Sequence, residues 1–465
     1  MAAIGTSCNP LRVAIIGSGP AGFYTVGSLL KQQDLRADID MYEKLPTPFG
    51  LVRAGVAPDH QKDKSVTRVY EKSASRASFR FFGNVEFGRH VGLEDIRRHY
   101  HQVVFATGAQ SDRALGIPGE DAAGSHAATD FVAWYNGHPE FAGHRFDLSA
   151  RSVAIVGLGN VALDVARILC KSAALLARTD IADHALEALR SSRVETVYLL
   201  GRRGPAQAAF TPAEIQEMGS LYDTDVQVRP EEARLDAMSR AALAASGDRN
   251  AARNAEIILG FSRCQAAGRA KQLIIRFLVS PTEIITDASG RVAAVRIVRN
   301  ELFAGPDGSA RSRPTGEQEV LPVQLVFRSV GYRGVALPGV PYDAASGVIP
   351  NTRGRVVDDH GQPIAGVYAV GWIKRGPSGV IGSNKIDAKE TVAGMVDDAA
   401  AGRSLNPADP GVDSAIALVR TRQPRVVAYE HWRKLDRIEV SKGMAAERPR
   451  VKFTDIAEML NVLER

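Results

Sequence analysis

The sequence contains few cysteines, and their placement excludes several kinds of redox protein. Cys8, Cys170 and Cys264 are the only ones among 465 residues. They are far apart and odd in number, and none belongs to a C-x-x-C pair. This pattern argues against a disulfide scaffold, a zinc site, a bound iron–sulfur cluster and an internal dithiol. We therefore expect no metal site, and we expect the protein to work in a reducing compartment.

Long hydrophobic runs are also missing. No apolar stretch reaches the ~18 residues that are needed to span a membrane. The first ten residues have neither the basic and apolar regions of a secretory signal nor the arginines of a transit peptide. With 45% hydrophobic and 24% charged residues, the composition is that of a globular protein, and its length predicts two or three domains.

Negative charge is in slight deficit, and the imbalance is local. The net charge is +6, and the segment from Arg420 to Lys452 alone has ten Lys/Arg against four Asp/Glu. This segment is interpreted either as a solvated helical tail or as a surface for an acidic protein partner. No module that combines aromatic and basic residues accompanies it, so we expect no binding of nucleic acid.

A glycine-rich turn near the start of the chain predicts a dinucleotide site. The apolar strand RVAII leads into Gly17, Ser18, Gly19, Pro20, Ala21 and Gly22, and a helical pattern follows. In such a turn the first glycine permits the bend, the second admits a pyrophosphate and the third lets helix and strand pack closely. A second strand ends in Glu43, 21 residues after Gly22. Its carboxylate is in the place expected to accept hydrogen bonds from a ribose.

A second turn of this kind occurs in the middle of the chain. The strand SVAIV leads into Gly157, Leu158, Gly159, Asn160, Val161 and Ala162, where alanine takes the third glycine's place. The next strand, VETVYL, ends in Gly201 and is followed by two cations, Arg202 and Arg203, in place of an acid. Arginines bind a phosphate where a carboxylate would repel it. This second site therefore favours NADPH, whose ribose carries a 2′-phosphate, whereas the first suits FAD.

A glycine loop late in the chain predicts the place of the flavin ring. The strand GVYAVGW leads into a loop of glycine, proline and serine at residues 376–382, and a helix is expected from about Asn384. The positive end of such a helix favours the negative charge that a reduced flavin ring carries.

These motifs resemble the adrenodoxin reductase family of NADPH–ferredoxin reductases. The similar stretches include GSGPAGFY, LPTPFGLVRAGVAPDHQ, GLGNVALDVARIL, GRRGP and GWIKRGPSGVIGSNK, and they extend from residue 12 to about 400. The resemblance implies an α/β protein with two Rossmann-like domains, the NADP domain being inserted into the FAD domain. The expected boundaries are 1–108 and 325–465 for FAD and 109–324 for NADP.

The resemblance also implies residue roles. FAD is expected to contact Ala21, Glu43, Leu51, Trp372, the backbone near Phe87 and the loop residues Gly379, Val380 and Ile381. NADPH is expected to contact residues 157–160, Arg202, Arg203 and Glu214. His60 and Glu214 match ionisable family residues near the flavin. Asp164, on the helix after Asn160, is either a third such residue or an acid that is stabilised by the helix N-terminus.

The implied function is electron transport. NADPH delivers a hydride to FAD, and single electrons then pass to an acidic iron–sulfur ferredoxin of the 2Fe–2S type. We expect the protein to be a monomer. Because the transit segment of mitochondrial members is missing, we also expect it to work in a bacterial cytoplasm. Two alternatives stay open: a flavin oxidoreductase that acts on a small substrate or a quinone, and an electron-input subunit of a larger complex.

Overall fold

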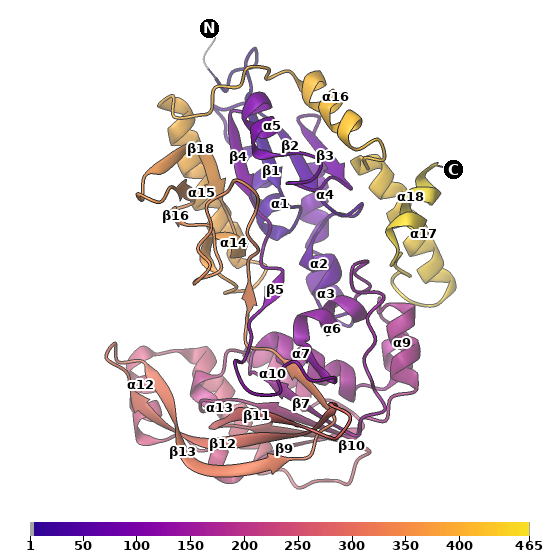
Figure 1. Cartoon of the computed structure of the whole chain (residues 1–465), viewed down its shortest axis with the longest axis vertical. Helices are drawn as coiled ribbons and strands as arrows, with labels where there is room; N and C mark the ends of the chain where they lie inside the picture. Colours follow the sequence, from indigo (N-terminus) through magenta and orange to yellow (C-terminus); the bar gives the residue numbers. More distant parts are fainter. Residues whose placement is uncertain (1–3, 465) are drawn as a thin grey trace. The chain divides into compact units, whose positions relative to one another are not determined.

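The computed structural model describes residues 4–464 and divides the chain into two compact units. Unit 1 comprises residues 4–111 and 332–464, and unit 2 comprises residues 112–331. Unit 1 contains both ends of the chain, so indigo and yellow segments occur together in it (Figure 1). The two connecting segments, β5 (Ser111–Asp112) and β15 (Tyr332–Arg333), pair as a two-stranded ribbon.

Unit 1 is built on one twisted, mainly parallel sheet. In sheet order the strands are β16 (Asn351–Thr352), β17 (Arg355–Val357), β18 (Pro363–Ala369), β4 (Gln102–Phe105), β1 (Leu11–Ile16), β2 (Ala37–Glu43) and β3 (Phe79–Gly83). The strands from β18 to β3 run parallel, and β16, β17 and β18 pair antiparallel. Strand β18, from the last third of the chain, therefore pairs directly with β4 from the first.

Helices cover both faces of this sheet, which explains why the four consecutive residues of β1 from Val13 to Ile16 are all apolar. Along β1, Val13 and Ile15 belong to one buried cluster, and Ala14 and Ile16 belong to the cluster on the opposite face. The helices of unit 1 are α1 (Pro20–Leu29), α2 (Leu51–Ala54), α3 (Gln61–Lys64), α4 (Thr67–Ala74), α5 (Leu93–His99), α14 (Trp372–Arg375), α15 (Ser383–Ala400), α16 (Val412–Arg422), α17 (Tyr429–Ala445) and α18 (Ile456–Glu464).

Unit 2 has a parallel sheet of its own and a smaller antiparallel one. The parallel order is β6 (Ser125–Ala127), β14 (Leu325–Arg328), β7 (Ser152–Val156), β8 (Thr196–Leu200), β10 (Lys271–Arg276) and β9 (Thr224–Val228). The antiparallel order is β11 (Val279–Thr286), β12 (Val292–Ala304) and β13 (Ala310–Leu321). Residues of these three strands cluster with Ala154 and Val156 of β7. The antiparallel sheet therefore covers one face of the parallel sheet.

Helices cover the other face of this parallel sheet, where Val153 and Ile155 of β7 lie among buried helical residues. The helices of unit 2 are α6 (Ala128–Tyr135), α7 (Asn160–Cys170), α8 (Ala173–Leu176), α9 (Asp183–Arg190), α10 (Pro212–Met218), α11 (Pro230–Ala233), α12 (Ala237–Ser246) and α13 (Arg249–Phe261), with a short 3-10 turn η1 (Pro205–Gln207).

The domain limits expected from the sequence differ slightly from the units of the structure. The expected changeovers are at 108/109 and 324/325, and the units change over at 111/112 and 331/332. The second difference has a clear cause, because β14 pairs in parallel with β6 and β7 and so belongs to unit 2.

Along the residues that the structure describes, no helix is long and apolar enough to cross a membrane.

Candidate functional site

The first glycine turn joins β1 to α1, and its three glycines have different surroundings. Gly17 has φ of 106°, and a Cβ there would lie 2.6 Å from the Ala106 carbonyl oxygen. A Cβ at Gly22 would lie 2.4 Å from the Gly17 oxygen, whereas one at Gly19 would meet nothing within 4 Å. The outer glycines are therefore required by the turn itself. The open space at Gly19 lets a ligand approach the backbone.

The helix that follows this turn begins without a side-chain cap. Gly19 is the N-cap of α1 and Pro20 stands in the first turn, so no side chain accepts hydrogen bonds from the first amides. Such a helix end attracts phosphate through its free N–H groups and its dipole. Glu43 ends β2 close by: its Oε2 accepts hydrogen bonds from the Ser18 amide at 3.1 Å and the Ser18 hydroxyl at 2.6 Å. The carboxylate is thereby held beside the turn, where it can accept hydrogen bonds from the hydroxyl groups of an unphosphorylated ribose.

The second turn repeats this construction in unit 2. Gly157 has φ of 132°, and a Cβ there would lie 2.1 Å from the Ser329 carbonyl oxygen. A Cβ at Gly159 would meet nothing within 4 Å, and Gly159 is the uncapped N-cap of α7. The third position is Ala162, whose side chain is fully buried. Two further contacts fix the turn: the Asn160 Oδ1 accepts the Thr211 amide at 2.8 Å, and Leu158 lies so close to Gly201 that a Cβ there would be 2.0 Å from its Cδ1.

Two arginines follow β8, where β2 of unit 1 ends in a carboxylate. Arg202 is exposed and Arg203 is partly buried. Burial, and secondarily the charge of Arg202, lower the pKa of Arg203. The backbone of Arg202 is held by the Asn300 Nδ2, which donates to its carbonyl oxygen at 2.9 Å. Arg202 also lines an open groove of about 630 Å³ over the antiparallel sheet. Two adjacent cations that repel each other are stabilised by a dianion such as a 2′-phosphate.

The glycine loop of unit 1 follows a short helix that the sequence pattern did not predict. Strand β18 ends at Ala369, and Trp372–Arg375 form α14 before the loop at 376–382. The Trp372 Nε1 donates to the Ser378 carbonyl oxygen at 3.1 Å, and Arg375 donates to the same oxygen. Gly379 has φ of 80°, Val380 is exposed and Ile381 packs against the core. The expected helix begins at Ser383, one residue before the predicted start.

Two further residues expected at FAD occupy different elements of unit 1. Leu51 is the first residue of α2 and is partly exposed. Phe87 lies in the segment after β3, and its ring is 5.4 Å from that of Phe105 at the end of β4. Both therefore lie on segments that follow the carboxyl ends of parallel strands, where ligands bind in folds of this type.

Asp164 and Glu214 share one buried cation in unit 2. Arg167 is fully buried, and its guanidinium lies 2.6 Å from Asp164 and 3.4 Å from Glu214. Glu217, one turn further along α10, lies 3.7 Å from the same guanidinium and 3.9 Å from Lys171. These ion pairs fix the three carboxylates on α7 and α10.

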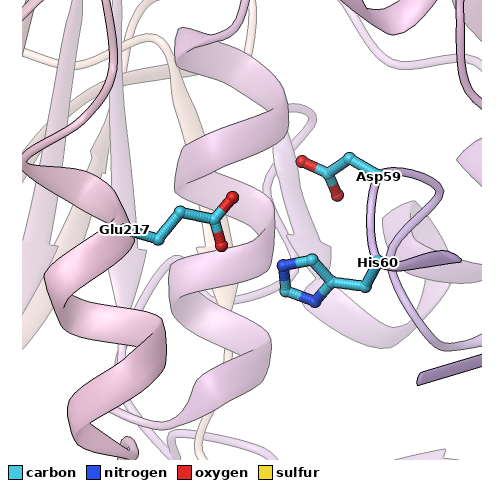
Figure 2. Close-up of side chains that lie close together, drawn as sticks. All are labelled: Asp59, His60 and Glu217. Carbon is cyan, nitrogen blue, oxygen red and sulfur yellow. The ribbon is translucent and has the colours of Figure 1, made fainter. Parts of the chain in front are cut away.

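His60 belongs to unit 1, on the loop that leads into α3. Figure 2 labels it beside Asp59 on this loop and labels Glu217 on α10 of unit 2. The His60 Nδ1 lies 3.9 Å from Asp63, one turn along α3.

Several residues around these sites escaped the sequence analysis. Arg167 follows Asp164 by three residues, a spacing that predicts an ion pair on one helix face. Lys374 is nearly buried and donates to Asp387 and Glu390 at 2.7 Å each. Asp387 also accepts the Gly371 amide at 2.5 Å, which ties the start of α14 to α15. The sequence feature that could have identified Lys374 as a buried cation is its position directly after apolar residues in GWIK.

Comparison with known proteins supports the same interpretation. Residues 11–218 match the family described as pyridine nucleotide-disulphide oxidoreductase. The NADPH-ferredoxin reductase FprA of Mycobacterium tuberculosis is 47% identical over 98% of this chain and 99% of its own. The human mitochondrial NADPH:adrenodoxin oxidoreductase is 43% identical over 97% of this chain and 92% of its own. The structure of Mycobacterium tuberculosis FprA in complex with NADPH matches with a TM-score of 0.93, at 44% identity, over 98% of this chain and 100% of that one.

Two dinucleotide turns, one beside a carboxylate and one beside two arginines, define an oxidoreductase that uses two dinucleotide cofactors. The predicted fold class, two Rossmann-like domains with one inserted into the other, is confirmed. The chain belongs to the adrenodoxin reductase family of NADPH–ferredoxin reductases. The resemblance inferred from the sequence motifs is thus confirmed.

Proposed function

We propose that this chain carries electrons from NADPH through FAD to an iron–sulfur ferredoxin. The observation that carries the proposal is the contrast between Glu43 and the pair Arg202 and Arg203. Glu43 ends the second strand of one dinucleotide fold, and the two arginines follow the second strand of the other. A carboxylate suits the adenosine ribose of FAD, and two cations suit the 2′-phosphate of NADPH.

Residues of unit 1 bind and orient FAD. The amides of α1 and the turn from Gly17 to Gly22 hold the pyrophosphate, and Glu43 holds the ribose. Leu51, the backbone near Phe87, Trp372 and the loop residues Gly379, Val380 and Ile381 hold the flavin end. When bound, FAD accepts a hydride from NADPH and releases electrons one at a time, which is chemistry that no side chain supplies.

Residues of unit 2 bind NADPH. The turn from Gly157 to Val161 and the amides of α7 hold its pyrophosphate, while Arg202 and Arg203 hold its 2′-phosphate. Glu214 and Asp164, fixed by Arg167, orient the nicotinamide end. His60 tunes the charge near the flavin. Hydride transfer depends mainly on the alignment of two rings, so these three residues are positioning groups.

The proposed acceptor is a small acidic ferredoxin with a 2Fe–2S cluster. The chain's net charge of +6 supports a partner of opposite charge. The three cysteines are unpaired and form no C-x-x-C pair, so the flavin has to discharge to another molecule. We further propose that the protein is a monomer and that it works in the bacterial cytoplasm. The match to a mycobacterial reductase supports the bacterial part of this proposal.

The test is ferredoxin reduction by the purified protein. NADPH, and NADH at the same concentration, would be mixed with the protein and with acidic 2Fe–2S ferredoxins or a neutral electron-accepting protein. We expect NADPH to support rapid reduction of at least one acidic ferredoxin and NADH to support little. Equal rates for all acceptors would overturn the ferredoxin assignment. Reduction of a small quinone alone would favour an oxidoreductase of small substrates.

A further inference from the structure

The C-terminal segment contains a charged group that is fully buried in unit 1. Glu439, on α17, has no exposed surface, and its carboxylate accepts hydrogen bonds from Arg53 at 2.8 and 2.5 Å. Arg450 donates to it at 3.1 Å and the Phe453 amide at 2.9 Å. Burial disfavours the charged carboxylate, but Arg53 and Arg450 outweigh it and lower the pKa of Glu439. Such a group is stable only with its partners, so it fixes Arg53 firmly.

Arg53 lies in a short segment that we call the α2 loop, residues 49–54. This loop begins with Phe49, which has φ of 84°, a conformation that non-glycine residues rarely adopt. The ring of Phe49 lies 5.8 Å from that of Trp432 on α17, edge to face. The Arg53 guanidinium lies 5.1 Å from the centre of the same Trp432 ring. Helix α17 therefore holds the α2 loop at two points, through Glu439 and through Trp432.

The α2 loop in turn lies against the first dinucleotide turn. The Phe49 amide donates to the Ser18 carbonyl oxygen at 3.0 Å. Gly50 approaches so closely that a Cβ there would be 3.0 Å from the Cα of Gly19. The loop also includes Leu51, an expected FAD contact. A displacement of Arg53 would consequently move both the edge of the phosphate site and Leu51.

The C-terminal segment makes a further contact with the α2 loop. The Lys452 Nζ donates to the Arg53 carbonyl oxygen at 3.2 Å. Arg450 also pairs with Asp436 at 2.6 Å. Two cations of this segment, Arg450 and Lys452, therefore make contacts inside unit 1.

We propose that Glu439 is a positioning residue for FAD, which acts through Arg53 by holding the α2 loop against the Gly17–Gly22 turn. The inference rests on the proposed function, because it takes FAD as the ligand of that turn. It gives the last part of the chain a specific role in cofactor retention.

The test compares two buried carboxylates of unit 1. Glu439→Gln removes the charge that holds Arg53. Asp398→Asn is the matched control: Asp398 is also nearly buried and accepts from Arg355 at 2.7 Å, Arg403 at 2.7 Å and Tyr368 at 2.9 Å. It lies near the far end of α15 from the glycine loop. FAD would be removed, and the Kd of each apoprotein for FAD measured by quenching of flavin fluorescence, alongside the apoprotein Tm.

We expect Glu439→Gln to raise the Kd for FAD about tenfold or more, because the weakened contact with Arg53 would let the α2 loop move away from the Gly17–Gly22 turn. Asp398→Asn should lower the Tm and leave the Kd within about twofold of the wild-type value. If Glu439→Gln does not fold as an apoprotein, Arg53→Lys decides the matter. It keeps the charge but not the paired hydrogen bonds, so its Kd should also rise.

Two failures are distinguishable. A wild-type apoprotein that does not bind FAD would overturn the cofactor assignment itself. Tight wild-type binding together with equal Kd changes in Glu439→Gln and Asp398→Asn, or an unchanged Kd in Arg53→Lys, would overturn the role of Glu439 and leave the proposed function standing.

Discussion

The two dinucleotide turns of this chain share one backbone design and differ in the charge beside them. In each, a glycine with positive φ lies against the backbone that follows a neighbouring strand, and the second glycine faces open space at an uncapped helix N-terminus. The second strand ends in Glu43 in unit 1 and is followed by Arg202 and Arg203 in unit 2. We infer that the backbone binds a pyrophosphate in both units and that the side chains at the end of the second strand select which ribose accompanies it.

The largest effect is expected from substitution of the first glycine in a dinucleotide turn. In Gly157→Ala the new Cβ would lie 2.1 Å from the Ser329 oxygen at a φ of 132°. Strain of about 3 kcal/mol should reduce NADPH-dependent activity about a hundredfold and lower the Tm of unit 2. Gly159→Ala is the matched control, because its Cβ meets nothing in the protein; it should impair NADPH use without lowering the Tm. FAD should stay bound in both variants, and its release from Gly157→Ala would show that the two units are not independent in this respect.

Loss of either arginine should have the next largest effect. A charge-assisted contact contributes about 1.5–3 kcal/mol, so Arg202→Ala or Arg203→Ala should lower kcat/KM for NADPH about tenfold or more. Activity with NADH should barely change, because NADH has no 2′-phosphate. Steady-state kinetics with ferricyanide as acceptor measures both, and Arg240→Ala serves as an exposed arginine control in the same unit. Equal losses with both nucleotides would indicate a folding defect.

Salt should affect the acceptor step more modestly. Raising ionic strength to ~0.15 M shortens the screening length to about 8 Å. Ferredoxin reduction should therefore slow several-fold, with a smaller dependence for ferricyanide. Charge reversals at Arg240, Arg249 and Arg253 test unit 2 as the docking surface, and reversals at Arg433 and Lys434 test unit 1. If only the second set slows ferredoxin reduction, docking occurs on the C-terminal helices of unit 1.

The smallest effect is expected on the stability of the protein at acidic pH. Arg53 and Arg450, the latter shared with Asp436, face Glu439 and keep its pKa below the ordinary 4.5. A carboxylate with a lowered folded-state pKa stabilises the protein above the unfolded value, and this contribution is lost as pH falls through the folded value. Unfolding followed by far-UV circular dichroism should show wild-type stability falling below about pH 4.5. Glu439→Gln should show a shallower fall, and identical slopes would contradict this assignment.

Local sequence patterns located both turns, because each depends on neighbouring residues. Gly17 to Gly22, Glu43 and the pair Arg202 and Arg203 all lie at strand ends that the apolar runs predicted. The start of α15 was predicted to within one residue for the same reason.

Features that depend on distant pairing were not predictable. Arg53 and Glu439 are 386 positions apart, and no local pattern connects them. The place of β14 in the sheet of unit 2 follows from its pairing with β6 and β7, so the domain limit at 324/325 fell seven residues too early. Helix α14 was not predicted because it has only four residues, Trp372–Arg375, and the first of them was assigned to the preceding strand GVYAVGW.

The central claim, that unit 2 selects its nucleotide through the 2′-phosphate, is tested most directly by binding without catalysis. Titration calorimetry would compare 2′,5′-ADP with 5′-AMP on the wild-type protein and on a variant carrying both Arg202→Ala and Arg203→Ala. We predict that the wild-type protein binds 2′,5′-ADP at least about a hundredfold more tightly, from two charge-assisted contacts. The double variant should bind both ligands equally. A preference for 2′,5′-ADP that survives in the double variant would contradict the account.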